Sequence, residues 1–487
     1  MFLAKQEILP FNSSVEYENS EMDRRLCRQC HVNTSLQLAT KSDDENDARY
    51  TARRLQVRRP RAGRLVQNAV ALIVSGGGTG LIGIVFWGVA AHVATAATVG
   101  RMSVEIAAMT LLATLAQLSF GSSFERFLPI AGDRTRAFVI RAYSLCAFIS
   151  LIIATLYVVL GIGHRFLPTS FGWRALFVIS VVLWTIFALQ DSVLIGLRAT
   201  RWVPVENILY SLVKLSLIPV FIMISASQGI FLAWMAPIVV IIVTVNWYLF
   251  RRRIPMHEAI KGATEKLPSL RELFVLTVAQ YATLLVTVLT GSIVSLIVID
   301  RLGAVASAHY YLPGQIAGGA SVALWSIDRS FLVEASSERG ALRRHARSAL
   351  KAGIIVLVST VGLGVIFAPE ILKIFGPSYA AKGTTLLRMF LLSLPGSAIV
   401  AFYSSFAWLD KRVWKLAVRE SLSAAVYFVL VFTLIGHYGI LSIGIAQLVT
   451  SVVQGFLFLP LLITRYRRIT SDDAANGAAV TDRVADP

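Results

Sequence analysis

Charged residues are scarce in this sequence, and that scarcity excludes an ordinary soluble domain. Asp, Glu, Lys and Arg make up 15% of the 487 residues, whereas soluble domains average about 25%. Acidic residues are the scarcest: 28 Asp and Glu stand against 46 Lys and Arg, a formal net charge of +18. Because the basic residues are spread between long apolar runs, the excess is typical of a polytopic membrane protein. We therefore expect membrane lipids, and no nucleic acid, as partners.

Cysteine is also scarce, with three residues in the chain, which excludes a disulfide framework. Cys27, Cys30 and His31 form "CRQCH", which matches the c-type haem attachment pattern. Haem attachment takes place outside the cytoplasm, whereas the charge distribution below places this segment inside. Three candidate ligands also leave a zinc site incomplete. We interpret the motif as a chance match and expect no cofactor and no metal. No apolar run follows Met1, so no cleavable signal peptide is expected.

Long uncharged runs are what the sequence has in abundance. Phe274–Ile299 and Ile440–Thr464 contain no Asp, Glu, Lys or Arg, and His92 is the only titratable residue of Leu65–Gly100. About 20 apolar residues span a bilayer core. The third run contains "VALIVSGGGTGLIG", whose glycines match the GxGxxG dinucleotide fingerprint. A nucleotide-binding unit would continue into alternating strands, but "LIGIVFWGVAAHV" follows. We interpret these glycines as part of a membrane helix.

The apolar runs predict an all-α, polytopic membrane protein with twelve spans. The expected limits are 66–90, 102–120, 137–161, 175–197, 204–226, 230–250, 274–299, 304–327, 350–369, 384–408, 413–435 and 439–463. The connections then divide by charge. One side holds several times as many Lys and Arg as the other, which holds only Arg101, Arg165, Arg174, Arg301, Lys373, Lys382 and Arg388. Since short cytoplasmic loops retain Lys and Arg, both termini are predicted to be cytoplasmic.

The two sets of six spans resemble each other in sequence. Phe127 in "RFLPIAGDRTRA" corresponds to Phe331 in "SFLVEASSERGA", Phe171 to Tyr379, and Asn207 in "VENIL" to Glu420 in "VRESL". Because six is even, the halves are expected to lie parallel, as in two-lobed transporters with a site between the lobes. The predicted organisation is a disordered cytoplasmic tail, a six-helix lobe, a basic cytoplasmic linker, a second six-helix lobe and a cytoplasmic tail, at 1–63, 64–250, 251–273, 274–464 and 465–487.

The span pattern, "FGSSFERFLPIAG" after the second span, and aromatic-Gly/Pro loops before the fourth and tenth spans resemble the polysaccharide flippases of the MOP exporter superfamily. The resemblance covers about residues 64–468. It implies flipping of an undecaprenyl-diphosphate-linked oligosaccharide across a bacterial plasma membrane for surface or exopolysaccharide biosynthesis. Polysaccharide-assembly enzymes are then potential partners. It also implies a bent first helix, for which the hinge candidates are Gly76, Gly77, Gly78 and Gly80. The alternative is a small-residue face for close helix packing.

Two other functions are compatible with parts of the sequence. A cation-coupled multidrug-type exporter of the same fold needs carboxylates inside the lobes, and Glu105 is the coupling-ion candidate. A membrane glycan polymerase or ligase needs a large outer loop with catalytic residues. The longest outer connection, near residues 370–383, is short and carries no readable catalytic pair. We therefore expect a transporter, not an enzyme.

Lys214 is the sharpest substrate candidate. If its helix begins at Pro204, the lysine lies about 15 Å into the span at 1.5 Å per residue, near half-depth. A lysine there costs about 2.5–3.5 kcal/mol on insertion scales, so it normally faces a cavity or a partner. An ammonium suits the diphosphate that the resemblance implies. The alternatives are snorkelling of the side chain to the headgroups and pairing with Glu105.

Tyr310, Tyr311 and Gln315, which open the eighth span, are candidate sugar contacts, although interfacial tyrosines are usually membrane anchors. Arg126 and Arg329 end the second and eighth spans at the inner side and could attract phosphate. The alternative for both arginines is a solvated loop charge, and Arg329 could instead pair with Asp328.

Overall fold

The computed structural model describes residues 62–260, 281, 288, 290–337, 342–409 and 413–485. The "CRQCH" motif, the predicted tail as far as residue 61 and most of the predicted 251–273 linker lie outside the described residues. Residues Val66–Pro487 form one compact unit.

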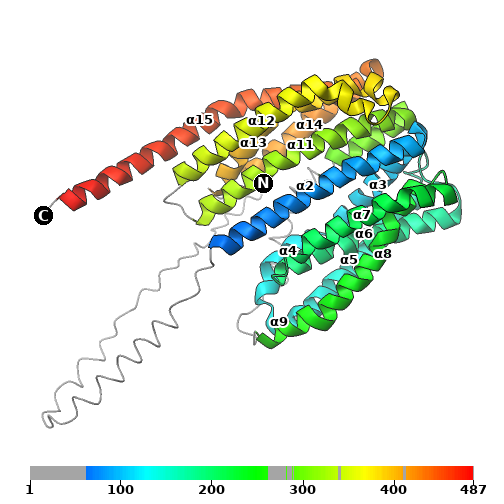
Figure 1. Ribbon diagram of the computed structural model, residues 1–487, viewed down its shortest axis with the longest axis horizontal. Helices are drawn as coiled ribbons and strands as arrows, with labels where there is room; N and C mark the ends of the chain where they lie inside the picture. The colour runs from blue at the N-terminus through cyan, green and yellow to red at the C-terminus, as the bar shows by residue number, and fades with distance from the viewer. Residues whose placement is uncertain are drawn as a thin grey trace, which may run out of the picture. The chain divides into compact units, whose positions relative to one another are not determined.

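The described residues are α-helical with short 3₁₀ and π segments (Figure 1). In the N-terminal half the helices are α2 (Ala62–Val93), α3 (Ala96–Ala116), α4 (Phe120–Phe127), α5 (Thr135–Val159), α6 (Phe171–Gly196), α7 (Trp202–Ile224), α8 (Gly229–Tyr248) and α9 (Ile254–Ile260). In the C-terminal half residues 290–302 are helical, and they are followed by α11 (Ala304–Ser337), α12 (Leu342–Lys373), α13 (Pro377–Leu409), α14 (Val413–Tyr438) and α15 (Leu441–Ala485).

These helices confirm an all-α polytopic membrane protein. In the described part of the chain, nine helices are long and apolar enough to cross a membrane, and Gly78–Val93 forms a shorter apolar stretch. Most of the described length of the predicted spans is helical, but the predicted span 102–120 runs past the end of α3 at Ala116. The predicted span 274–299 is described continuously only from residue 290. Large apolar side chains are exposed along the helices, among them Met223, Val243, Ile355 and Phe456. A surface of this kind is stable in contact with lipid, because exposing so much apolar area to water would cost free energy.

The segment after α3 forms a sharp break followed by an amphipathic helix. Leu118 and Ser119 adopt left-handed conformations, with φ of 46° and 59°, and end the helix. Such conformations cost about 1–2 kcal/mol per residue outside glycine, so packing must hold them. In α4, Phe124 and Phe127 are buried while Arg126 is exposed. The three-residue spacing of the phenylalanines places both on one face of the helix.

Close helix crossings depend on small residues. The two halves meet where α3 packs on α11, and a side chain at Gly100 would overlap the backbone of Ala304. In the C-terminal half α13 crosses α15, where Gly396 lies against the backbone of Ser451. Glycine at these two positions permits backbone approach that any side chain would prevent.

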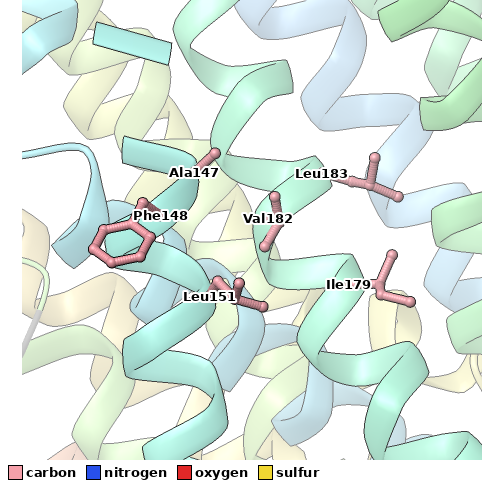
Figure 2. A pocket seen from close by; sticks show the side chains of 6 residues that line it. All are labelled: Ala147, Phe148, Leu151, Ile179, Val182 and Leu183. Atoms are coloured by element: carbon pink, nitrogen blue, oxygen red, sulfur yellow. The ribbon is translucent and has the colours of Figure 1, made fainter. Parts of the chain in front are cut away.

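An apolar groove separates parts of α5 and α6. Figure 2 shows its six side chains coming from these two neighbouring helices: Ala147, Phe148, Leu151, Ile179, Val182 and Leu183. Its volume is about 350 Å³. Because every lining side chain is apolar and several are exposed, the groove suits hydrocarbon and offers nothing to orient a polar cargo.

Candidate functional site

A polar cavity of about 300 Å³ lies where the two halves meet. We call it the interlobe cavity. The N-terminal half contributes side chains from α3 and α8, and the C-terminal half contributes residues 291–295 and α11. The lining residues are Ile106, Ala107, Thr110, Trp234, Gly291, Ser292, Ser295, Tyr310, Tyr311, Gly314 and Gln315.

The structure brings three sequence-predicted residues together in this cavity. Tyr311 and Gln315 are one helical turn apart on α11 and therefore share a face, and their side chains interact. Tyr310 interacts with Ser295. The ring of Tyr311 packs edge-on against Trp87, with centroids 4.7 Å apart. Aromatic faces beside hydroxyl and amide groups are the combination that binds polar small molecules in largely apolar pockets.

Lys214 lies behind one wall of the interlobe cavity, in a cage of aromatic rings. Its ammonium nitrogen is 3.6 Å from the centroid of Trp234, 4.7 Å from that of Tyr210 and 5.3 Å from that of Phe86. The residue is 5% exposed. Lys214 and Tyr210 are four residues apart on α7, while Phe86 comes from α2 and Trp234 from α8. Such rings attract a cation through their negative faces.

The cage bears on both alternatives for Lys214. A lysine that snorkels extends its ammonium to the headgroup layer, whereas this ammonium is enclosed by rings. Glu105 is not its partner: that carboxylate, 2% exposed on α3, interacts with Gln228 and Arg101. Within the described residues Lys214 forms no ion pair. Trp234 both lines the interlobe cavity and contacts Lys214, so its ring belongs to both features.

The predicted arginines lie apart from this cavity. Arg126 is exposed at the end of α4, with its guanidinium 5.4 Å from the ring centroid of Phe127. Arg329 belongs to α11, and its side chain lies outside the described residues. It follows Tyr310 on the same helix at a separation of about 28 Å at 1.5 Å per residue. Neither arginine lines the interlobe cavity that holds the predicted sugar contacts.

The hinge glycines lie inside one uninterrupted helix. α2 continues through Gly76, Gly77, Gly78 and Gly80. A side-chain carbon added at Gly78 or Gly80 would meet nothing within 4 Å. Close packing by neighbouring helices therefore does not account for these two glycines in this conformation, and the hinge stays a prediction.

Sequence reasoning missed a buried group of amides and carboxylates in the N-terminal half. Gln190 bonds to Glu206, Asn246 donates to Gln190 at 2.9 Å, and Asn207 donates to Asp191 at 3.0 Å. We call these five residues the amide–carboxylate cluster. One carboxylate oxygen of Glu206 is buried without a hydrogen-bond partner. The sequence does show polar residues near the ends of three apolar runs, which could have indicated the cluster. Nothing in the sequence shows that these residues meet.

A second polar cavity, of about 650 Å³, lies within the C-terminal half and was not foreseen. We call it the C-lobe cavity. Ser404, Ser405, Arg419 and Glu420 line its charged end, while Tyr427 and Gln454 line another part. The signal in the sequence was the density of hydroxyl and amide residues in the last three apolar runs.

Solved structures share this arrangement of helices. No protein-family model and no curated protein matches the chain. The structure titled "Lipid II flippase MurJ, inward closed conformation" aligns with a TM-score of 0.59 and 14% identity over 84% of this chain and 91% of that chain. The MATE multidrug transporter DinF-BH aligns with a TM-score of 0.58 and 13% identity over 84% and 97%. An inward-facing multidrug resistance MATE transporter of the MOP superfamily gives 0.56 and 15% over 82% and 95%.

The chain shares the fold of these MATE transporters and of MurJ. At these identities the likeness establishes the fold, and the cargo has to be argued from the cavities. The MOP fold agrees with the predicted superfamily, while the assignment to its polysaccharide flippases stays a prediction. The connection between α12 and α13, residues 374–376, is shorter than the sequence suggested, because both helices extend further.

Proposed function

We propose that this protein is a MOP-type transporter that flips a lipid-linked oligosaccharide across the plasma membrane for surface or exopolysaccharide biosynthesis. The observation that carries the proposal is the interlobe cavity with its paired tyrosines. Tyr310, Tyr311 and Gln315 offer hydroxyl and amide groups beside the ring of Trp234. A sugar presents hydroxyls at its edges and an apolar face to an aromatic ring, so this lining suits it.

The caged lysine supports the same cargo. An ammonium beside the cavity adds attraction for a diphosphate, and Trp234 belongs both to the cage and to the cavity lining. In this conformation the charge is held by three rings. Each cation–π contact is worth about 2 kcal/mol or more when desolvated, so the attraction of the diphosphate would have to offset the loss of these contacts.

Complementation of a transporter-deficient strain tests the proposal. The wild-type chain should restore surface polysaccharide and lower the amount of lipid-linked oligosaccharide retained in the inner leaflet. Tyr311→Ala and Gln315→Ala should each lower the restored polysaccharide at least several-fold at normal membrane abundance. Tyr438→Ala is the matched control, because that tyrosine is exposed on α14 away from the cavity. A wild-type chain that restores nothing and lowers no retained oligosaccharide would refute the proposal.

The amide–carboxylate cluster favours a second candidate, a cation-coupled multidrug-type exporter. Glu206 is 6% exposed, and one of its oxygens lacks a partner. A buried carboxylate is costly unless it binds a proton, a cation or a hydrogen-bond donor, which is the requirement of a coupling site. Two of the solved structures with this fold are named as multidrug transporters, which supports this candidate.

Dye uptake into everted vesicles tests this second candidate. Under an imposed proton or sodium gradient, an exporter should accumulate a cationic dye, and Glu206→Gln should abolish the dependence on the gradient. Glu370→Gln is the control, since Glu370 forms an exposed ion pair with Lys373. Gradient-independent behaviour of the wild type would exclude this candidate and leave the flippase proposal in place.

A further inference from the structure

The C-lobe cavity has the properties of a binding site rather than a packing defect. It is lined by residues 290–291 and by α11, α13, α14 and α15, all from the C-terminal half. Its volume of about 650 Å³ falls in the range of small-molecule pockets, about 300–1,000 Å³. The lining residues are Thr290, Gly291, Trp325, Asp328, Ser397, Val400, Ala401, Ser404, Ser405, Arg419, Glu420, Ser423, Ala424, Tyr427, Gln447, Thr450, Ser451 and Gln454.

The three charged side chains of this cavity already have partners within the protein. Arg419 donates to Ser404 at 2.9 Å and forms an ion pair with Glu420. Asp328 accepts a hydrogen bond from Ser405 at 2.7 Å. An anionic ligand would have to compete with Glu420 for the guanidinium, and a cationic ligand would have to compete with Arg419 for Glu420. The arrangement therefore favours an uncharged ligand.

Hydrogen-bonding capacity nevertheless remains unused in the lining. The Nε of Arg419 and the hydroxyl oxygen of Thr450 are buried and have no hydrogen-bond partner. Buried polar atoms of this kind are usually satisfied by a partner in the functional state. Gln447 and Gln454 add side-chain amides, each of which both donates and accepts. A ligand that carries several groups able to donate and accept at once would satisfy this set.

The internal repeat predicts that Glu206 and Asn207 on α7 correspond to Arg419 and Glu420 on α14. In the N-terminal half Gln190 bonds to Glu206, and Asn246 donates to Gln190. In the C-terminal half Arg419 and Glu420 line a cavity. At these predicted counterparts the first half therefore has direct hydrogen bonds and the second half has open space.

Aromatic side chains complete the cavity. Trp325 and Tyr427 line it together with the hydroxyl and amide groups. A neutral sugar ring has hydroxyls that donate and accept and a face of C–H bonds that packs on aromatic rings. The paired Arg419 and Glu420, the unused hydrogen-bonding groups and the aromatic side chains together match that chemistry.

We propose that the C-lobe cavity binds an uncharged sugar residue of the transported glycan. The proposal rests on the flippase function above and adds a second sugar-binding site next to the interlobe cavity, with which it shares Gly291. The Arg419–Glu420 pair and Asp328 form the fixed hydrogen-bonding frame. Thr450 and Gln454 supply the groups that bind the sugar hydroxyls.

Binding of two defined probes to the full-length protein in nanodiscs tests the proposal. One probe is a polyprenyl diphosphate that carries a neutral disaccharide, and the other is the same polyprenyl diphosphate without sugar. The wild type should bind the glycosylated probe more tightly. Thr450→Val and Gln454→Met, each nearly isosteric with the native residue, should each weaken binding of the glycosylated probe by about tenfold. Their binding of the sugar-free probe should stay within about twofold of the wild type.

A matched control and the pattern of affinities distinguish failure of the sugar site from failure of the flippase proposal. Thr433→Val removes a hydroxyl that bonds only to its own helix backbone on the exposed face of α14, so it should change neither affinity. If the wild type prefers the glycosylated probe and both cavity variants retain that preference, the sugar site is wrong while the flippase proposal stands. If the wild type binds both probes equally, both proposals fail. An equal loss for both probes in the cavity variants would assign the cavity to the diphosphate and overturn the sugar site.

Discussion

The ammonium nitrogen of Lys214 lies 3.6 Å from the centre of the Trp234 ring, and the same ring lines the cavity between the two halves. This relationship joins a buried positive charge on α7 to a polar cavity that α11 completes. The ring of Trp234 therefore separates the ammonium of Lys214 from the cavity.

Replacing Lys214 should impair transport without impairing folding. We expect Lys214→Ala to reach normal membrane abundance but to lower the restored surface polysaccharide at least tenfold, because the charge for the diphosphate is lost. Lys214→Arg should retain part of the activity, since a guanidinium also binds phosphate and stacks on rings. Complementation of a transporter-deficient strain measures both. Full activity of Lys214→Ala would leave the lysine as a structural charge.

Substituting alanine for Gly78 or Gly80 tests whether α2 bends there during transport. Because a side-chain carbon at Gly78 or Gly80 meets no atom within 4 Å, alanine fits this conformation. Alanine also has a helix propensity about 1 kcal/mol better than that of glycine. We expect normal abundance and unchanged or slightly raised thermal stability, together with lower transport. Gly83→Ala is the control, since that position is equally open. Wild-type transport by both hinge variants would rule the hinge out.

The contact between the two halves should depend on Gly100. A side chain there would overlap the backbone of Ala304 on α11. Gly100→Ala should therefore lower the free energy of unfolding by about 1–3 kcal/mol, as overpacking does in close-packed interiors. Thermal unfolding in detergent measures the change. Gly172→Ala, in open space at the start of α6, should be neutral. Equal melting temperatures for wild type and Gly100→Ala would contradict the close crossing.

The charge distribution predicts the orientation of the chain. A reporter fused after Arg271 or Arg468 should be cytoplasmic, and one fused near Ser227 should be exported. Paired alkaline phosphatase and fluorescent protein fusions distinguish the two sides. Export of the Arg271 fusion would overturn the arrangement with both termini inside.

Removal of the N-terminal tail should leave the transporter intact. The segment Met1–Arg49 has too little apolar content to pack against the helices. A chain without it should insert and complement at the level of the full-length protein, which immunoblotting and polysaccharide assays together measure. Loss of activity at normal abundance would instead identify the tail as a regulatory or partner-binding element.

The sequence by itself determined the membrane class, the helical ranges and some of the residues at the interlobe cavity. A run of about 20 apolar residues has one stable environment whatever its neighbours are, so the spans could be predicted without knowing their contacts. Tyr311 and Gln315 lie on one face because they are four residues apart on one helix, which the sequence also shows.

Only the tertiary structure decided which helices meet. Lys214 is enclosed by Phe86 and Trp234 from two other helices, and Glu206 meets Gln190 across a helix boundary. The C-lobe cavity likewise depends on how α13 and α15 cross at Gly396 and Ser451. The hydrophobic period of a single helix indicates which face is buried, but it carries no information about the rotation and crossing of its neighbour. Contacts between helices follow from the packing of small and large side chains across the whole bundle. The two polar cavities are products of this packing, so the sequence of one helix could not reveal them.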